Sequence, residues 1–373
     1  MSDSAVTAPA RSNAPRLHYL DAARAALMLL GIPYHAAQPY TDRAWFISSV
    51  SGSETVAFIG NYLHLFRMHA FYVIAGFFAA MILSRRGPAI WIKDRARRLL
   101  IPLLFAVVVI LPIMFLALDL EQGRGIAGWI DHMQTEPSFW IAHTWFLRDL
   151  FLYCVGLCII DIIWGIRERD VSTARMQIIL ILTFILISSL YVYAVRTTLT
   201  LYVHFGDDQL IRFFYYIPFF LAGVVLWMIP SGFANFRRWS APGAIMAALW
   251  LFMATLLGAR DDVGTLPAAM ISILNGFVGT WLAVTLAHRF LDRPSPRVMM
   301  LVDGSLTIYL IHLAIVLIVG PVLIGSLKMP LVEWGLIAVS ALLGSFIVYR
   351  IARHLPMLYY AMNGQRPPKR AGE

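Results

Sequence analysis

The chain has 373 residues, of which 60% are hydrophobic and 14% charged, and its formal net charge is +9. Soluble domains have roughly 45–50% apolar and about 25% charged residues, so this composition excludes an ordinary soluble domain and favours a membrane protein. The positive charge does not indicate a nucleic-acid partner, because the basic residues separate apolar segments and do not gather on one solvated face.

Residues 1–16 are small, polar and rich in alanine and proline, and Arg11 and Arg16 precede the first apolar segment. A secretory signal has a short apolar stretch followed by a small-residue cleavage site, and neither is visible here. We therefore expect a disordered cytoplasmic tail. The two cysteines, Cys154 and Cys158, lie four residues apart on one predicted helix and indicate neither a disulfide framework nor a metal site.

Ten apolar segments are long enough to be expected as membrane-spanning helices, each of which needs about 20 residues. The sequence predicts an all-α bundle in which residues 17–352 form one transmembrane domain and 353–373 a cytoplasmic C-terminal tail. The ten segments are 17–39, 57–84, 99–118, 143–165, 176–195, 212–229, 242–259, 267–287, 299–324 and 331–351.

The loops between these segments differ strongly in charge. Of the 30 Lys and Arg residues, 21 lie in one set of alternate loops together with both ends of the chain, and six lie in the opposite set. Positive charge marks the cytoplasmic side of a membrane protein. The sequence therefore predicts a multi-pass protein of a bacterial inner membrane, in contact with lipid, with both termini in the cytoplasm.

The first segment reads LHYLDAARAALMLLGIPYHAAQPY and carries charged groups that are costly within a membrane. Arg24 and His35 are about three helical turns apart, so they share a face and lie about 16 Å from each other along the axis. Asp21 lies three residues before Arg24 and is placed to pair with it. Pro33 is expected to bend the helix just before His35. A structural ion pair and a buried packing histidine explain the same residues without chemistry.

Three further segments combine polar and aromatic residues. The second contains HLFRMHAFYVIAGFF, in which His64 and Arg67 are three residues apart and face together, His69 points elsewhere, and Gly76 permits close helix approach. These groups serve equally well as candidate catalytic residues and as polar contacts between helices.

The fourth and ninth segments carry the remaining candidates. The fourth begins HTWFLRDLFLY, with His143 and Trp145 near its periplasmic boundary. The ninth reads LVDGSLTIYLIHLAIV, in which Ser305, Tyr309 and His312 recur on one helical face. We take His143, Trp145, Tyr309 and His312 as candidate substrate-binding residues.

The loop after the second segment reads SRRGPAIWIKDRARRLLIP and is strongly basic. Positive anchoring of the loop in the cytoplasm explains this charge without any ligand. Alternatively, Arg95, Arg97 and Arg98 form a cytoplasmic phosphate site through charge-assisted hydrogen bonds.

The combined motifs resemble the acyltransferase-3 family of membrane acyltransferases over residues 17–325. They are LDAARAALMLLGIPYH, FRMHAFYVIAGFF, DRARRLLIPLLF, HTWFLRDLFLY, FYYIPFFLAGVVLW and DGSLTIYLIHLAIV. The resemblance is strongest to a branch whose members succinylate osmoregulated periplasmic glucans from a cytoplasmic succinyl donor. It implies an acyl-CoA-dependent O-acyltransferase whose substrates are succinyl-CoA and a periplasmic glucan, with no tightly bound cofactor.

The family pattern also implies roles for single residues. An Arg and a His separated by ten residues are matched by Arg24 and His35, and an Arg-x-Arg element is matched by Arg95 and Arg97. The family's Phe-Phe-x-x-Ser-Gly element is matched only in part, because Ala75 stands where the family has its serine.

A sugar hydroxyl becomes a good nucleophile only when a base removes its proton, and histidine is the usual base near neutral pH. We therefore expect His35 to act as this base or as an acyl-accepting nucleophile, with Arg24 and Asp21 on the same stripe and Arg67 and His64 as further catalytic candidates.

Two other functions fit the same sequence: O-acetylation of another surface polysaccharide, and proton-coupled transport through His and Asp relays. A transporter is expected to have two symmetry-related halves, and no such repeat is visible. The sequence also leaves the oligomeric state open, a homodimer included.

Overall fold

The computed structural model describes residues 17–43, 45–135, 140–169, 171, 173–202, 208–259 and 264–367. Every regular element within these ranges is a helix, as the sequence predicts. The helices of the first half are α1 His18–Leu29, α2 Gly31–Ala37, η1 Gln38–Tyr40, α3 Glu54–His64, α4 Arg67–Arg86, α5 Pro88–Phe105, η2 Ala106–Ile110, α6 Leu111–Glu121, α7 Gly125–Thr135, η4 Ala142–Thr144 and α8 Trp145–Trp164.

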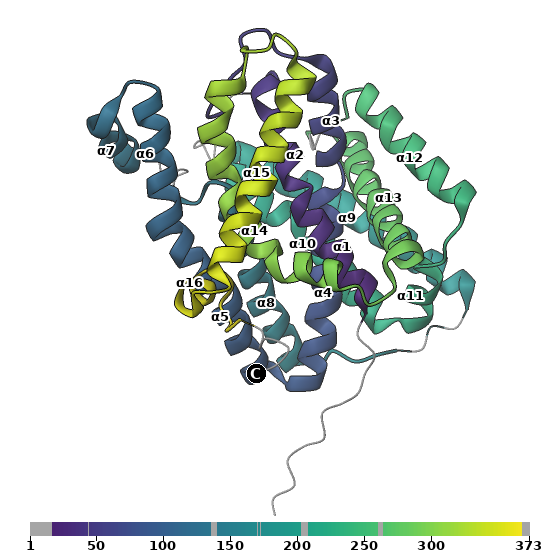
Figure 1. Cartoon of the computed structure of the whole chain (residues 1–373). Coiled ribbons are helices and arrows are strands. Elements are labelled where there is room, and N and C mark those ends of the chain that lie inside the picture. The colour runs from purple at the N-terminus through teal and green to yellow at the C-terminus, as the bar shows by residue number, and fades with distance from the viewer. Residues whose placement is uncertain are drawn as a thin grey trace, which may run out of the picture.

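The second half contains the remaining helices, and all of them pack into one bundle with the first half (Figure 1). They are α9 Ala174–Tyr202, α10 Asp208–Met228, α11 Pro230–Phe236, α12 Ala241–Leu256, α13 Leu266–Leu291, α14 Pro296–Leu323, α15 Pro330–Ala352 and α16 Pro356–Asn363.

Each of the ten predicted spans coincides with one helix or with two or three consecutive helices. Among the described residues, seven helices are long and apolar enough to cross a membrane, or eight if the bent pair α11–α12 counts as one span. The first predicted span is interrupted at Leu30, α8 contains Arg148, Asp149 and Asp161, and α12 has only 16 residues. The count of ten therefore stays a prediction.

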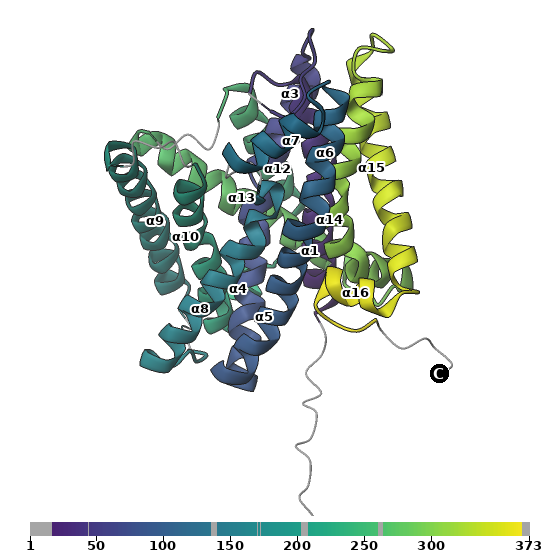
Figure 2. The same ribbon diagram turned by 90° about the vertical axis from the view of Figure 1, so that its left-hand side faces the viewer.

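The two ends of the described chain lie at the same end of the bundle (Figure 2). The start of α1 and helix α16 are found there, whereas α3 and α7 lie at the opposite end. This placement agrees with an even number of crossings. The assignment of this end to the cytoplasm rests on the loop charges. The predicted disordered tail, residues 1–16, lies outside the described residues.

Helices α4 and α10 cross with their backbones in contact. A β-carbon on Gly76 would collide with the carbonyl group of Phe220, and one on Gly223 would collide with the carbonyl group of Val73. Only glycine permits such an approach at these two positions. The predicted role of Gly76, to permit close approach of a neighbouring helix, is confirmed. The crossing also places the polar N-terminal turn of α4 deep in the bundle.

The first span changes direction close to its proline. Helix α1 ends at Leu29 and α2 starts at Gly31, because Pro33 has no backbone N–H to donate to the carbonyl group of Leu29. The indole N–H of Trp334 donates to the carbonyl oxygen of Pro33 at 3.0 Å. The break turns the residues after Leu30, including His35, towards α14 and α15.

The C-terminal segment contains a further helix, α16, that packs against α5 and α14 (Figure 2). The hydroxyl of Tyr359 donates to Asp303 at 2.6 Å, and the Asn363 amide donates to Thr307 at 2.9 Å. Tyr349 of α15 donates to the same Asp303 carboxylate at 2.7 Å. Asp303 therefore holds the ends of three helices together.

Candidate functional site

Three histidines from distant parts of the chain meet inside the bundle. The ring centroids of His35 and His312 are 5.3 Å apart, those of His143 and His312 are 5.3 Å apart, and those of His35 and His143 are 6.3 Å apart. His143 and His312 are buried, whereas His35 is half-buried. We call these three residues the histidine cluster.

Tyr309 fixes two rings of the histidine cluster. His143 donates from Nε2 to the carbonyl oxygen of Tyr309 at 3.1 Å, and His312 donates from Nδ1 to the same oxygen at 2.6 Å. In return, the Tyr309 hydroxyl donates to the carbonyl oxygen of His143. A carbonyl oxygen only accepts, so the nitrogens facing it carry hydrogen, and in neutral rings the opposite nitrogens carry lone pairs.

These opposite nitrogens are the positions of the cluster at which a proton can be accepted. Nδ1 of His143 and Nε2 of His312 are buried and have no hydrogen-bond partner among the described residues, and the same holds for Nδ1 of His35. A buried acceptor that lacks a partner is costly, so such groups concentrate where a ligand or a reacting proton completes them. The cluster can therefore accept a proton from a substrate hydroxyl.

Arg67 lies beside the cluster at the start of α4, and only 5% of its surface is exposed. Its guanidinium lies 4.9 Å from the ring centroid of Tyr34, and it forms no ion pair with any described carboxylate. A β-carbon on residue 31 would lie 3.3 Å from Nη1 of Arg67 and 3.9 Å from Nε2 of His312. Because residue 31 is glycine, both side chains reach the same point.

Aromatic rings surround His35 on its remaining sides. Tyr34 packs against His35 with ring centroids 4.9 Å apart, and His64 stacks on Tyr34 with ring centroids 5.2 Å apart. The ring of Trp45 lies 6.2 Å from that of His35 at an interplanar angle of 17°. Trp45 is not predicted from the sequence, because the loop before α3 has no periodic pattern that assigns its side chains to a site.

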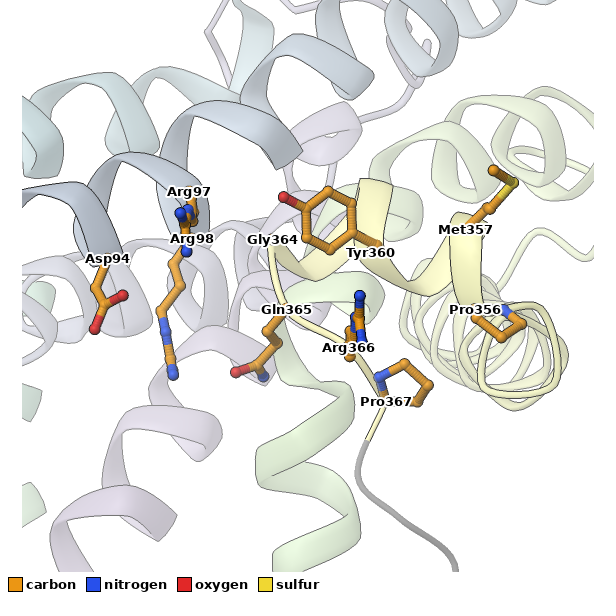
Figure 3. A pocket seen from close by; sticks show the side chains of 10 residues that line it. All are labelled: Asp94, Arg97, Arg98, Pro356, Met357, Tyr360, Gly364, Gln365, Arg366 and Pro367. Atoms are coloured by element: carbon orange, nitrogen blue, oxygen red, sulfur yellow. The ribbon is translucent and has the colours of Figure 1, made fainter. Parts of the chain in front are cut away.

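A pocket of about 880 Å³ opens at the end of the bundle that carries α16, between α5 and the C-terminal segment. Figure 3 shows Arg97 and Arg98 of α5 facing the segment that carries Tyr360 and Arg366. These three arginines are exposed and form no ion pair among the described residues, whereas the nearby Asp94 is bound by Arg86 at 2.6 Å. The pocket is therefore suited to a polyanion.

A second cavity of about 150 Å³ continues from this pocket towards the histidine cluster, and Arg98 and Gln365 line both. Arg24 and Arg95 also line the second cavity, and Phe146 is among its apolar residues. The ring of Phe146 in turn contacts that of Tyr309, with centroids 4.6 Å apart. The second cavity therefore reaches from Arg98 and Gln365, which it shares with the outer pocket, to Phe146, which contacts Tyr309 beside the histidine cluster.

The structure separates some residues that the sequence analysis groups together. Asp21 and Arg24 form the expected pair at 3.4 Å, but Arg24 lies with Arg95 and Arg98 and not beside His35. Arg95 lines the inner cavity and Arg97 the outer pocket, because residues two apart on a helix point in nearly opposite directions.

Two other candidates also differ from their expected positions. His143 is buried against Tyr309 and does not lie at the rim of the bundle, because η4 carries the chain inwards before α8 begins. Trp145 faces another way: its ring stacks on Tyr216 at 5.7 Å, and the guanidinium of Arg212 lies 4.6 Å from its centroid. Tyr309 and His312 share the predicted face of α14 and both reach the cluster.

His69 of α4 lies outside the histidine cluster. His69 points away from the cluster, as predicted, and its Nε2 lies 2.7 Å from the hydroxyl of Tyr215. Within the described part of the chain, no group of three or more His, Cys, Asp or Glu side chains is arranged to hold a metal ion. The site brings together the histidines, which are acid–base groups, and several arginine side chains.

Comparison with known proteins shows which family the chain resembles. Residues 17–350 match the family model described as an acyltransferase domain. The chain is 30% identical over 380 residues to glucans biosynthesis protein C of Salmonella typhimurium, covering 96% of this chain and 97% of that protein. It is likewise 30% identical over 379 residues to the protein of the same name from Salmonella paratyphi B, covering 95% and 97%. No solved structure matches the chain.

Proposed function

Because the chain belongs to the acyltransferase-3 family, we propose that it transfers a succinyl group from cytoplasmic succinyl-CoA to hydroxyl groups of an osmoregulated periplasmic glucan. The observation that carries this proposal is the alignment of three features. The arginine-lined pocket, the narrow cavity and the histidine cluster follow one another from one end of the bundle towards its centre.

The outer pocket fits the nucleotide end of coenzyme A. That end carries several phosphate groups, and arginine binds phosphate oxygens through paired, charge-assisted hydrogen bonds. Arg97, Arg98 and Arg366 supply three such side chains from two elements, α5 and the segment after α16. The ring of Tyr360 lines the same pocket and offers an aromatic surface on which the nucleobase of coenzyme A can stack (Figure 3).

The inner cavity fits the slim arm that carries the thioester. Phe71, Phe146 and Leu147 give it an apolar wall, while Arg24 and Arg95 lie nearer the charged end. A volume of about 150 Å³ is too small for a nucleotide, which stays in the outer pocket. The acyl group at the tip of the arm is thereby delivered towards Tyr309 and the histidine cluster.

His35 is the proposed general base. It is the histidine of the cluster that is half-buried, and it lies beside Trp45, whose flat ring suits stacking against a sugar. The oxygen of the sugar hydroxyl attacks the thioester carbonyl carbon and gives its proton to His35. The carbon–sulfur bond then breaks, and the proton passes to the departing thiolate sulfur. A route through an acyl-His intermediate uses the same residues.

The proposal is tested in a strain from which the protein has been removed. Mass spectrometry of its periplasmic glucans should show the loss of succinyl groups, which the intact protein restores and the His35→Ala variant does not. Loss of acetyl groups instead would identify the O-acetylation reaction. If the glucans of the strain with the protein and of the strain without it carry the same modifications, acyl transfer to this acceptor is contradicted.

A further inference from the structure

We propose that Arg67 binds the free carboxylate of the succinyl group and thereby selects a dicarboxylic acyl donor. This inference rests on the proposed function and adds the residue that determines which acyl group is accepted. It starts from the burial of Arg67, whose side chain is 5% exposed at the start of α4, next to the histidine cluster.

A buried guanidinium without a carboxylate partner is costly in a membrane protein. The groups facing Arg67 carry no negative charge: Tyr34 presents its ring to the guanidinium at 4.9 Å, and Gly31 and His312 lie on the neighbouring side. Nε of Arg67 has no hydrogen-bond partner within the described residues. A bound anion would supply both the missing charge and the missing acceptor.

The other arginines of the site are differently placed. Arg24 pairs with Asp21 at 3.4 Å, and its side chain lies in the cavity nearer the nucleotide end. Arg97 and Arg98 are exposed in the outer pocket. Arg67 is the arginine that lies beyond the inner cavity, where the tip of the acyl group arrives.

The distances suit a four-carbon diacid. Nη1 of Arg67 and Nε2 of His312 both lie within 4 Å of one point above Gly31, at 3.3 and 3.9 Å. The carbonyl and carboxylate carbons of a succinyl group are separated by three C–C bonds of about 1.5 Å each, or roughly 4 Å when extended. A carboxylate on Arg67 therefore leaves the reacting carbonyl beside the histidine cluster. An acetyl group is too short to reach both Arg67 and the histidine cluster.

The test compares succinyl-CoA with acetyl-CoA as donors for purified full-length protein. Wild-type protein should prefer succinyl-CoA, and Arg67→Gln should lower kcat/KM for succinyl-CoA by about 10- to 100-fold, which is the effect of losing hydrogen bonds to a charged group. The value for acetyl-CoA should change much less. Arg350→Gln, an exposed arginine at the end of α15, is the matched control.

An equal loss with both donors would overturn the proposal, since Arg67 would then act on the reacting carbonyl or on the fold. If Arg67→Gln does not fold, the wild-type protein still decides the matter. Non-hydrolysable succinyl and acetyl thioethers of coenzyme A should then compete for binding with the succinyl compound stronger, and equal affinities would refute the inference. Failure of wild-type protein to transfer any acyl group would refute the proposed function instead.

Discussion

Single side chains are expected to determine the chemistry of the histidine cluster, in which His35 is half-buried while His143 and His312 are buried. Replacing His35 with Ala should lower acyl transfer by roughly 10²- to 10⁴-fold, the usual contribution of a general base. The thermal transition in detergent should change little, because His35 is half-buried and its Nδ1 has no partner to lose among the described residues.

The matched control is His354→Ala, which changes an exposed histidine at the far end of the bundle. This variant should keep wild-type activity. Full transfer by the His35 variant would show that His143 or His312 acts as the base.

At this scale the sequence predicts residue pairs well when they lie on one helix. Asp21 with Arg24, and Tyr309 with His312, follow from helical spacing and are found in the structure. Contacts between helices are not encoded in this way. The meeting of His35 with His143, and the stacking of Trp45 on His35, depend on how loops and broken helices enter the bundle.

The elements that position the site depend on close helix crossings. Gly76→Ala should destabilise the protein by about 1–3 kcal/mol, because the added methyl group meets the backbone of Phe220 and forces α4 and α10 apart. The loss of stability is measured as a lower thermal transition temperature in detergent, and the activity of the variant is measured beside it.

Gly156→Ala is the control for this prediction. It lies within α8, and a β-carbon there meets nothing within 4 Å, so its stability should be unchanged or slightly raised by the better helix propensity of alanine. Equal effects of the two substitutions would contradict the close-crossing explanation.

Helix α16 is the element that the sequence analysis treats as part of a tail, because its eight residues are too few to give a clear helical pattern. Burial and the hydrogen bond to the Asp303 carboxylate raise the pKa of Tyr359. The protonated hydroxyl is the form that donates this hydrogen bond. Since that form persists at and above the usual pKa of tyrosine, the tether between α16 and α14 should hold throughout the physiological pH range and be lost only at strongly alkaline pH.

Arg366 lines the outer pocket that is proposed to bind the donor. Arg366→Gln should raise KM for the coenzyme A donor with little change in kcat, because one phosphate contact is lost while the histidine cluster is unchanged. Tyr359→Phe should shift KM in the same direction by loosening α16. Steady-state kinetics with varied donor concentration measure both effects. An unchanged KM in both variants would remove α16 from the donor site.

For the whole molecule, composition is enough to predict an all-α membrane bundle, and the ten predicted segments fall on helices in the right order. The exact number of crossings is harder to predict, since the first segment is broken at Leu30 and α8 carries the charged residues Arg148, Asp149 and Asp161. The separation of Arg24 from the histidine cluster follows from the length of α1, because an arginine and a histidine on one face are still about 16 Å apart.

The arrangement of the two substrates is a property of the entire bundle. The arginine-lined pocket lies at the end that carries α16, and the loop bearing Trp45 lies towards the opposite end with α3 (Figure 2). Donor and acceptor are therefore expected to enter from opposite membrane faces and meet at the histidine cluster, so that coenzyme A itself never crosses.

Sealed vesicles with the protein in one orientation measure this sidedness. Succinyl-CoA supplied only on the cytoplasmic face should modify glucan supplied only on the periplasmic face, and coenzyme A should be released on the cytoplasmic face. Transfer that occurs only when donor and glucan are placed on the same face would contradict the arrangement.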